Sequence, residues 1–274
     1  MDMLAIVCDT HTNSTLGLCP PNGIELDDGG TYKPSKLQRI LWDAWTDFTD
    51  TVTALKKKHN ARLCTIFNGD ISDGDHHNTT QIISRSENTM HKIAHKTLGL
   101  LYDASDVSYV VRGTRAHGGN SGSIEETFAE DIGAVQNKET GAYSWGHVYL
   151  NLNGIIIEAA HHGSMGRLPW TEKNAGNKLA AITLFKSAEE GKRVPHLAFR
   201  SHNHRYSDSG GHYRVRGICL PGWQGKTEYI AQIDATAVPD IGGAIVLCDP
   251  SLPGGYEVII KRYPFRPATP MRVF

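Results

Sequence analysis

The chain has 274 residues, and 28 Lys and Arg stand against 29 Asp and Glu, so its formal net charge is −1. A chain this close to neutral does not hold long nucleic acid by bulk electrostatics, although a nuclease with local basic residues stays possible. Five cysteines without CxxC spacing, no membrane-length apolar run and no signal peptide lead us to expect a soluble, cytoplasmic protein with reduced, buried thiols.

Strands and helices alternate in the first half of the chain. Residues 4–9 are predicted to form a short buried strand, and the Gly-, Pro-, Asn- and Asp-rich loop over 12–34 is expected to overhang its end. Apolar residues at three- and four-residue steps predict an amphipathic helix over 34–58. The elements predicted next are a strand over 62–67, a helix over 80–102, a strand over 107–111 and a short helix over 123–132.

The second half is dominated by strands. Two strands are predicted over 147–160, around the turn Asn153-Gly154, and a helix is predicted over 171–190. Four further strands are predicted near 196–200, 212–219, 243–248 and 256–262. This order predicts an α/β fold with a β-rich second half, in a single domain over 1–274.

Side chains that can bind a metal come directly after several predicted strands. They are Asp9, His11, Asp70, either His161 or His162, His202 and His204. Residues i and i+2 of an extended segment point to the same side, so each Asp-x-His or His-x-His pair can converge. Mixed carboxylate and imidazole sets suit Mn, Fe, Zn, Co or Ni, whereas calcium wants more oxygen. Six such ligands are too many for one tetrahedral ion and suit two ions that share a carboxylate.

Five segments of the chain resemble, in order, the sequence blocks of the calcineurin-like metallophosphoesterases. Those blocks are DxH, GDxxD, GNH[DE], a lone or doubled His, and GHxH. The matching segments are Asp9-Thr10-His11, Gly69-Asp70-Ile71-Ser72-Asp73, the loop at Gly113, His161 and Ser201-His202-Asn203-His204. The resemblance covers residues 4–205. It implies a sandwich of two mixed β-sheets flanked by α-helices, with a dinuclear metal site at the strand ends.

The resemblance also implies how the ligands are shared. One metal is expected to be held by Asp9, His11, Asp70 and His204. Asp70 would bridge to a second metal held by His161 and His202. We prefer His161 to His162 because it comes first after its strand. The expected cofactor is a pair of divalent ions, with Mn2+ as first choice and Fe, Zn, Ni or Co as alternatives.

The third block departs from the family pattern. Thr114 stands where the family has the Asn ligand of the second metal, and Arg115 stands where it has a His. Thr is a poor ligand for such metals, while Arg115 can clamp a phosphate but cannot release a proton near neutral pH. His117 lies two residues further on. We prefer it as proton donor or phosphate contact, with ligation of the second metal and a structural loop role as alternatives.

These features predict a hydrolase of phosphate esters, in which a hydroxide bridging two metals attacks phosphorus. A phosphodiesterase acting on DNA, RNA or a nucleotide is the preferred reading. A phosphomonoesterase, including a protein phosphatase, is the alternative that Arg112 and Arg115 keep open. A scaffold protein of the same fold with weakened catalysis is an alternative of another class.

Other residues carry weaker signals. His91 and His95 share a helix face, but we expect no further ligand near them and interpret them as non-catalytic. His76 and His77 can line the site or lie in a solvated loop, and Asn120 and Ser121 can bind phosphate. Tyr32, Trp170 and Trp223 can stack on a base, although simple packing is the more common role of such residues.

Overall fold

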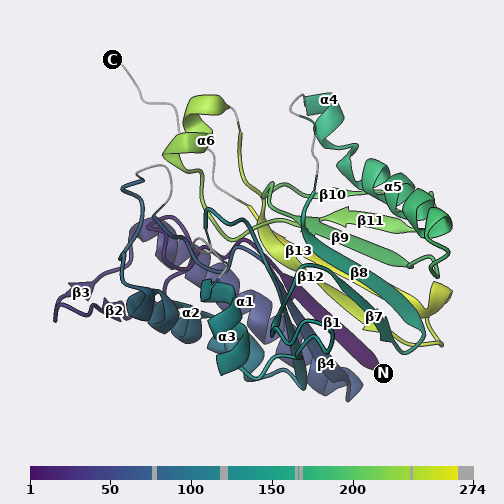
Figure 1. Cartoon of the computed structure of the whole chain (residues 1–274), viewed down its shortest axis with the longest axis horizontal. Coiled ribbons are helices and arrows are strands. Elements are labelled where there is room, and N and C mark those ends of the chain that lie inside the picture. Colours follow the sequence, from purple (N-terminus) through teal and green to yellow (C-terminus); the bar gives the residue numbers. More distant parts are fainter. Residues whose placement is uncertain (76–78, 118–122, 164–165, 167–168, 235–236, 265–274) are drawn as a thin grey trace.

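Two β-sheets pack face to face, with helices on their outer sides (Figure 1). The computed structural model describes residues 1–75, 79–117, 123–163, 166, 169–234 and 237–264, and gives no side-chain detail for 169–170. The sandwich of two mixed sheets flanked by helices that the sequence predicted is confirmed.

The larger sheet has six strands in the order β13-β12-β1-β4-β5-β6. The strands β1, β4, β5 and β6 run parallel, β12 is antiparallel to β1, and β13 is antiparallel to β12. Their bounds are β1 Asp2–Val7, β4 Arg62–Asn68, β5 Val107–Val111, β6 Ser144–Trp145, β12 Ile241–Cys248 and β13 Tyr256–Tyr263.

The second sheet has five strands in the order β10-β11-β9-β8-β7. The central strands β8, β9 and β11 are parallel, while β7 and β10 close the two edges in antiparallel pairs. Their bounds are β7 Val148–Leu152, β8 Ile155–His162, β9 Leu197–Ser201, β10 Ser207–Asp208 and β11 Arg216–Cys219.

Alternating side chains of β1 build two cores. Successive residues of a strand face opposite sides of the sheet. Met3, Ala5 and Val7 therefore join a core with the helices, where Trp45 and Phe48 are fully buried. Leu4 and Ile6 face the other sheet and join the core between the two sheets, with Ile157, Leu197 and Phe199.

Three helices cover the six-stranded sheet and α5 covers the other (Figure 1). Their bounds are α1 Lys36–His59, α2 Glu87–Tyr102, α3 Ser123–Asp131, α4 Pro169–Glu172, α5 Ala175–Glu189 and α6 Glu228–Ile233. A capping box of Ser35 and Gln38 starts α1. The helix α5 packs closely on β11 because Gly217 has no side chain. A Cβ at this position would meet the carbonyl oxygen of Gly176 at 2.4 Å.

The chain before α2 departs from the prediction. The helix begins at Glu87, with Ser86 as its N-cap, and not near Thr80. The preceding segment is held in an extended path because the Ile83 N–H donates to the Asn13 carbonyl at 2.7 Å. Pairing with the loop over 12–34 therefore prevents the segment before Glu87 from forming the helix that its apolar spacing predicts.

The long loop takes two paths. Near Leu18 it lies against the chain that follows β1, where the Leu18 N–H donates to the Thr10 carbonyl at 3.1 Å. Its short strands β2 (Ile24–Glu25) and β3 (Thr31–Tyr32) form a hairpin, and Ile24 packs on Ile93 of α2.

The expectation for the cysteines is confirmed, since all five are buried and free. Among the described residues, no helix has the length and apolar character needed to span a bilayer.

Candidate metal centre

The predicted ligands gather at one end of the sandwich. Three strands of the six-stranded sheet end there, followed by Asp9 and His11, by Asp70, and by Thr114. The strands β8 and β9 of the other sheet end at the same place. We call the group formed by Asp9, His11, Asp70, His161, His162, His202 and His204 the strand-end cluster. Carboxylates thus come from one sheet and most of the imidazoles from the other.

The backbone under this cluster is held in an uncommon conformation. Positive φ angles occur at Asp9 (51°), His11 (41°), Asp70 (52°), His202 (75°) and His204 (50°). Among the described residues, the other non-glycine positions with positive φ are two asparagines, which tolerate it. Such conformations cost free energy and concentrate at functional sites, so this backbone is positioned for the side chains that it carries.

Asp9, His11 and His204 form a buried triad. The Nε2 atoms of His11 and His204 lie 3.3 Å apart, and Asp9 Oδ1 lies 3.3 Å from the latter nitrogen. Asp9 Oδ1 is buried without a well-formed hydrogen bond to any described residue. Although burial alone would raise the pKa of Asp9, the charge of His204 lowers it below its usual range. Three converging donors with an unsatisfied carboxylate oxygen fit a cation.

Asp70 and His161 meet at the centre of the cluster, where His161 Nε2 lies 3.0 Å from Asp70 Oδ2. The Nδ1–H of His161 donates to the Asn68 carbonyl at 2.8 Å, which turns Nε2 toward the carboxylate. This backbone bond fixes the ring as it does in many metal-binding histidines. Burial lowers the pKa of His161, but the charge of Asp70 outweighs it and raises the value to about 10.

Thr114 fills the position of the expected Asn. Its N–H donates to Asp70 Oδ1 at 2.6 Å, and its hydroxyl lies 3.2 Å from Asp70 Oδ2 and 3.1 Å from His202 Nδ1. His202 Nδ1 is itself 3.8 Å from Asp70 Oδ2. The Thr114 hydroxyl therefore orients the side chains of Asp70 and His202, two of the expected metal ligands.

Glu125 of α3 is a supporting residue that sequence reasoning missed. Its buried carboxylate accepts the N–H groups of Asp70, at 2.8 Å, and Gly113, at 2.9 Å. Burial, helped by the charge of Asp70, raises the pKa of Glu125 to about 7. The loops have no space between them, because a Cβ on Gly113 would meet Asp70 Oδ1 at 2.1 Å. Nothing in the sequence separates this glutamate from an ordinary surface residue of a helix.

His117 lies beside the strand-end cluster and pairs with Asp73. Their Nδ1 and Oδ1 atoms are 2.5 Å apart, and His117 Nε2 lies 4.0 Å from Asp70 Oδ2. The rings of His117 and His11 are 4.7 Å apart. Burial lowers the pKa of His117, but the hydrogen bond to Asp73 and the charge of Asp70 outweigh it and raise the pKa. The imidazole thus stays protonated to higher pH than a free histidine.

Three of the remaining candidates lie among the described residues: Arg115, Trp223 and Tyr32. Arg115 is exposed on the turn before His117. Trp223 is fully buried against Trp45 and Phe48, so the alternative of simple packing is confirmed and its ring does not stack on a base. Tyr32 donates its hydroxyl to Gln38 Oε1 at 2.8 Å. His76, His77, Asn120, Ser121 and the side chain of Trp170 lie outside the described residues.

A second group of possible ligands lies on the helices. His91 and His95 of α2 are joined by Asp131 of α3, and the expectation that no further ligand lies near them is wrong. His95 Nε2 is 3.1 Å from Asp131 Oδ2. We call these three residues the helix-surface cluster.

No family model matches the chain, and no curated protein matches it. Solved structures similar to it include Vps29 from Entamoeba histolytica complexed with zinc, with 8% identity, a TM-score of 0.42, and coverage of 95% of this chain and 98% of that one. A predicted phosphoesterase from Streptococcus pneumoniae has 10% identity, a TM-score of 0.36, and coverage of 95% and 98%. A dimetal phosphatase from Danio rerio has 10% identity, a TM-score of 0.40, and coverage of 89% and 92%. At these identities and TM-scores, the function of the chain has to be argued from its own side chains.

Proposed function

We propose that the chain is a calcineurin-like metallophosphoesterase, an enzyme that hydrolyses phosphate esters with a dinuclear metal centre. The observation that carries the proposal is the convergence of the strand-end cluster, whose donors come from two sheets and are brought together on a strained backbone.

The first ion would be held by Asp9, His11, Asp70 and His204, and the second by Asp70, His161 and His202. Asp9 Oδ1, a buried atom without a well-formed hydrogen bond among the described residues, supports a missing cation in this region. When bound, the ions would activate water and neutralise charge on the phosphoryl oxygens. Mn2+ is the first candidate for this mixed donor set, with Fe, Zn, Ni and Co as alternatives.

We propose that His117 protonates the leaving group. The carboxylate of Asp73 accepts a hydrogen bond from Nδ1–H and also from Gln224 Nε2, at 3.1 Å, so the ring is held in one orientation. Its Nε2–H then faces the carboxylate of Asp70 and can be transferred to the departing alkoxide. In the metal-free protein, the hydrogen bond to Asp73 and the charge of Asp70 outweigh burial and raise the pKa of His117, which favours the protonated ring that a proton donor needs.

A phosphodiester in a nucleic acid or nucleotide is the proposed substrate. A monoester dianion carries one more charge than a diester and is commonly held by a fixed arginine. Here Arg112 donates to the Ser144 carbonyl at 3.0 Å, and Arg115 is exposed. The contacts of the described residues therefore supply no arginine fixed beside Asp70, which favours the diester.

Activity measurements with matched substrates test this proposal. The protein is loaded with Mn, Ni, Co, Zn or Mg and assayed on bis(p-nitrophenyl) phosphate, p-nitrophenyl phosphate, a cyclic nucleotide and single-stranded DNA. We expect metal-dependent hydrolysis, faster on the diesters than on the monoester. Faster turnover of the monoester would favour a phosphatase. Absence of hydrolysis in a protein that also binds no metal would favour the scaffold.

A further inference from the structure

The strand β8 carries one extra residue just before the strand-end cluster. Its pairing with β9 is regular from Ile157, opposite Leu197, to Ala159, opposite Phe199. The next pair is His162 opposite Ser201, so three steps along β8 match two steps along β9. This irregularity is a β-bulge, a feature that redirects side chains and is frequent beside active sites.

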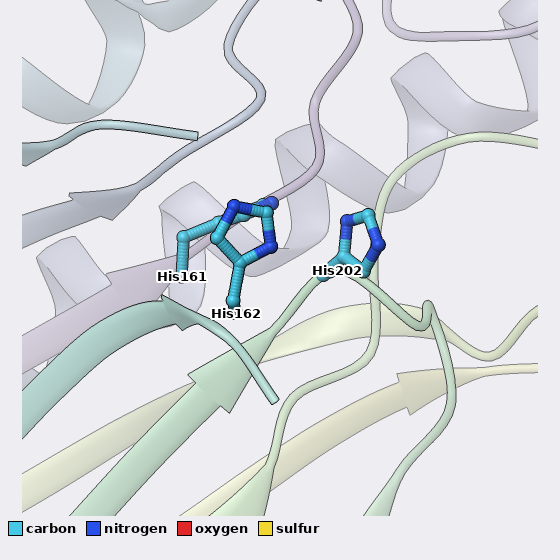
Figure 2. A group of neighbouring side chains, drawn as sticks. All are labelled: His161, His162 and His202. Atoms are coloured by element: carbon cyan, nitrogen blue, oxygen red, sulfur yellow. The ribbon is translucent and has the colours of Figure 1, made fainter. Parts of the chain in front are cut away.

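The bulge places two adjacent histidines in one group. In a regular strand, His161 and His162 would face opposite sides of the sheet. Here their ring centroids lie 5.0 Å apart, and His202 is 5.4 Å from the first ring and 4.9 Å from the second. One nitrogen of each ring lies within 4.8 Å of the others. Figure 2 shows the three rings together at the strand ends, with nitrogens of His162 and His202 turned toward the space between them.

Three side chains are expected to hold the second ion, one fewer than are expected to hold the first. Asp70, His161 and His202 are three donors, and Thr114 replaces the amide that would be the fourth. A neutral hydroxyl is a weak ligand for these metals, and that of Thr114 is already shared between Asp70 and His202. Thr114, which stands in place of the expected Asn, and His162, the additional histidine, thus both lie beside the expected position of the second ion.

We propose that His162 is a ligand of the second ion and takes the place of the missing amide. This inference rests on the proposed function, since it assumes a dinuclear centre. The second ion would then have three imidazoles and one shared carboxylate, whereas the first has two of each. Imidazole-rich sets suit Zn2+, Ni2+ or Co2+ better than Mn2+, so the second site would be the more selective for those ions.

Cobalt binding to variants of the whole chain tests the proposal. Co2+ is titrated into three metal-free proteins: wild type, His162→Ala and His212→Ala. Calorimetry measures the heat of binding, and visible spectroscopy measures the absorption of the bound ion. His212 is an exposed histidine outside the cluster, so its variant is the matched control. We expect two ions in wild type and in His212→Ala. In His162→Ala the affinity of the second ion should fall at least about 10–100-fold, the loss typical even of outer partners of a metal site.

A second variant separates lost ligation from lost structure. In the double variant Thr114→Asn/His162→Ala, the added amide should restore the second ion and its absorption, since it returns a donor at the expected position. Failure to restore it would contradict the replacement of the amide by His162. Two ions bound to His162→Ala with unchanged affinity would overturn the inference and leave the proposed function intact. A wild type that binds no ion would overturn both.

Discussion

The strand-end cluster and the helix-surface cluster contain the same kinds of side chain but differ in burial and in how the backbone holds them. Both bring histidines within reach of an aspartate. In the first, Asp9, Asp70 and His161 are almost completely buried. In the second, the side chains of His95 and Asp131 are 29% and 48% exposed.

The backbone explains the difference between the two clusters. His161 and Asp70 are held by bonds to the Asn68 carbonyl and from the Thr114 N–H, on strand ends locked into two sheets. His91 and His95 are neighbours only because residues four apart lie on one side of a helix. The contact from His95 to Asp131 of α3 is partly open to solvent. The fold therefore holds the side chains of the strand-end cluster in place, whereas two members of the helix-surface cluster are placed mainly by the helix that carries them.

The same substitution in both clusters gives the largest expected contrast. Asp70→Asn should lower phosphodiesterase activity about 1000-fold or more, because it removes charge from both ions and each 1.4 kcal/mol or so of lost stabilisation is tenfold in rate. Asp131→Asn should leave activity unchanged. The two variants are compared by kcat/KM with saturating metal. Equal losses in both would break the distinction between the clusters.

A substitution at His117 tests the proposed proton transfer. His117→Gln should lower hydrolysis of an alkyl phosphodiester about 100-fold or more, as expected for loss of a general acid. Activated aryl esters, whose leaving groups need little protonation, should lose less than about tenfold. His95→Gln in the helix-surface cluster is the control and should change neither. Equal losses on alkyl and aryl substrates would count against the proton-donor role.

Removal of metal should destabilise the strand-end cluster specifically. An ion present at about 100 times its Kd stabilises the folded state by about 2.7 kcal/mol. For a chain of this size that corresponds to a Tm shift of about 5–10 °C, measured with and without chelator. The shift should persist in Asp131→Asn and vanish in Asp70→Asn. A shift lost in Asp131→Asn would place the stabilising ion on the helices.

The smallest expected effect concerns the strands under the cluster. Glu158 of β8 pairs with Arg200 of β9. Burial would raise the pKa of Glu158, but His147 and the charge of Arg200 lower it to about 2 from its ordinary 4.5. Since the folded pKa is the lower one, this pair stabilises the protein above about pH 4.5, and the effect is lost as pH falls through about 2.

Glu158→Gln should therefore lower the Tm by a few degrees at pH 7. The difference from wild type should shrink as the pH falls from 5 toward 2. Thermal unfolding at several pH values measures this. A difference that does not change with pH would mean that packing, and not the charge of Glu158, is responsible.

Much of this architecture could be predicted because its signals are local. Buried strands appear as short apolar runs, and each predicted ligand follows the end of one such run, as with Asp9 after β1. The segment before α2 could not be predicted in this way. Its apolar residues suggest a helix, but a bond from Ile83 to the distant Asn13 holds it extended.

The features of the site that could not be predicted depend on contacts between segments far apart in sequence. Glu125 becomes buried only when α3 packs against the loops of Asp70 and Gly113. The grouping of His162 with His161 requires the bulge in β8, which is defined by its pairing with β9. Trp223 lies in a loop, so no helical or strand spacing marks it as buried. Its contact with Trp45 forms only when the chain after β11 packs against α1.

Anomalous diffraction from crystals of the metal-loaded protein tests the central claim most directly. Data collected at the absorption edge of the bound metal locate each ion without any assumption about activity. The account predicts two neighbouring peaks, one among Asp9, His11 and His204 and the other beside His161 and His202, with Asp70 between them. A peak only between His91, His95 and Asp131, or none at the strand ends, would contradict it.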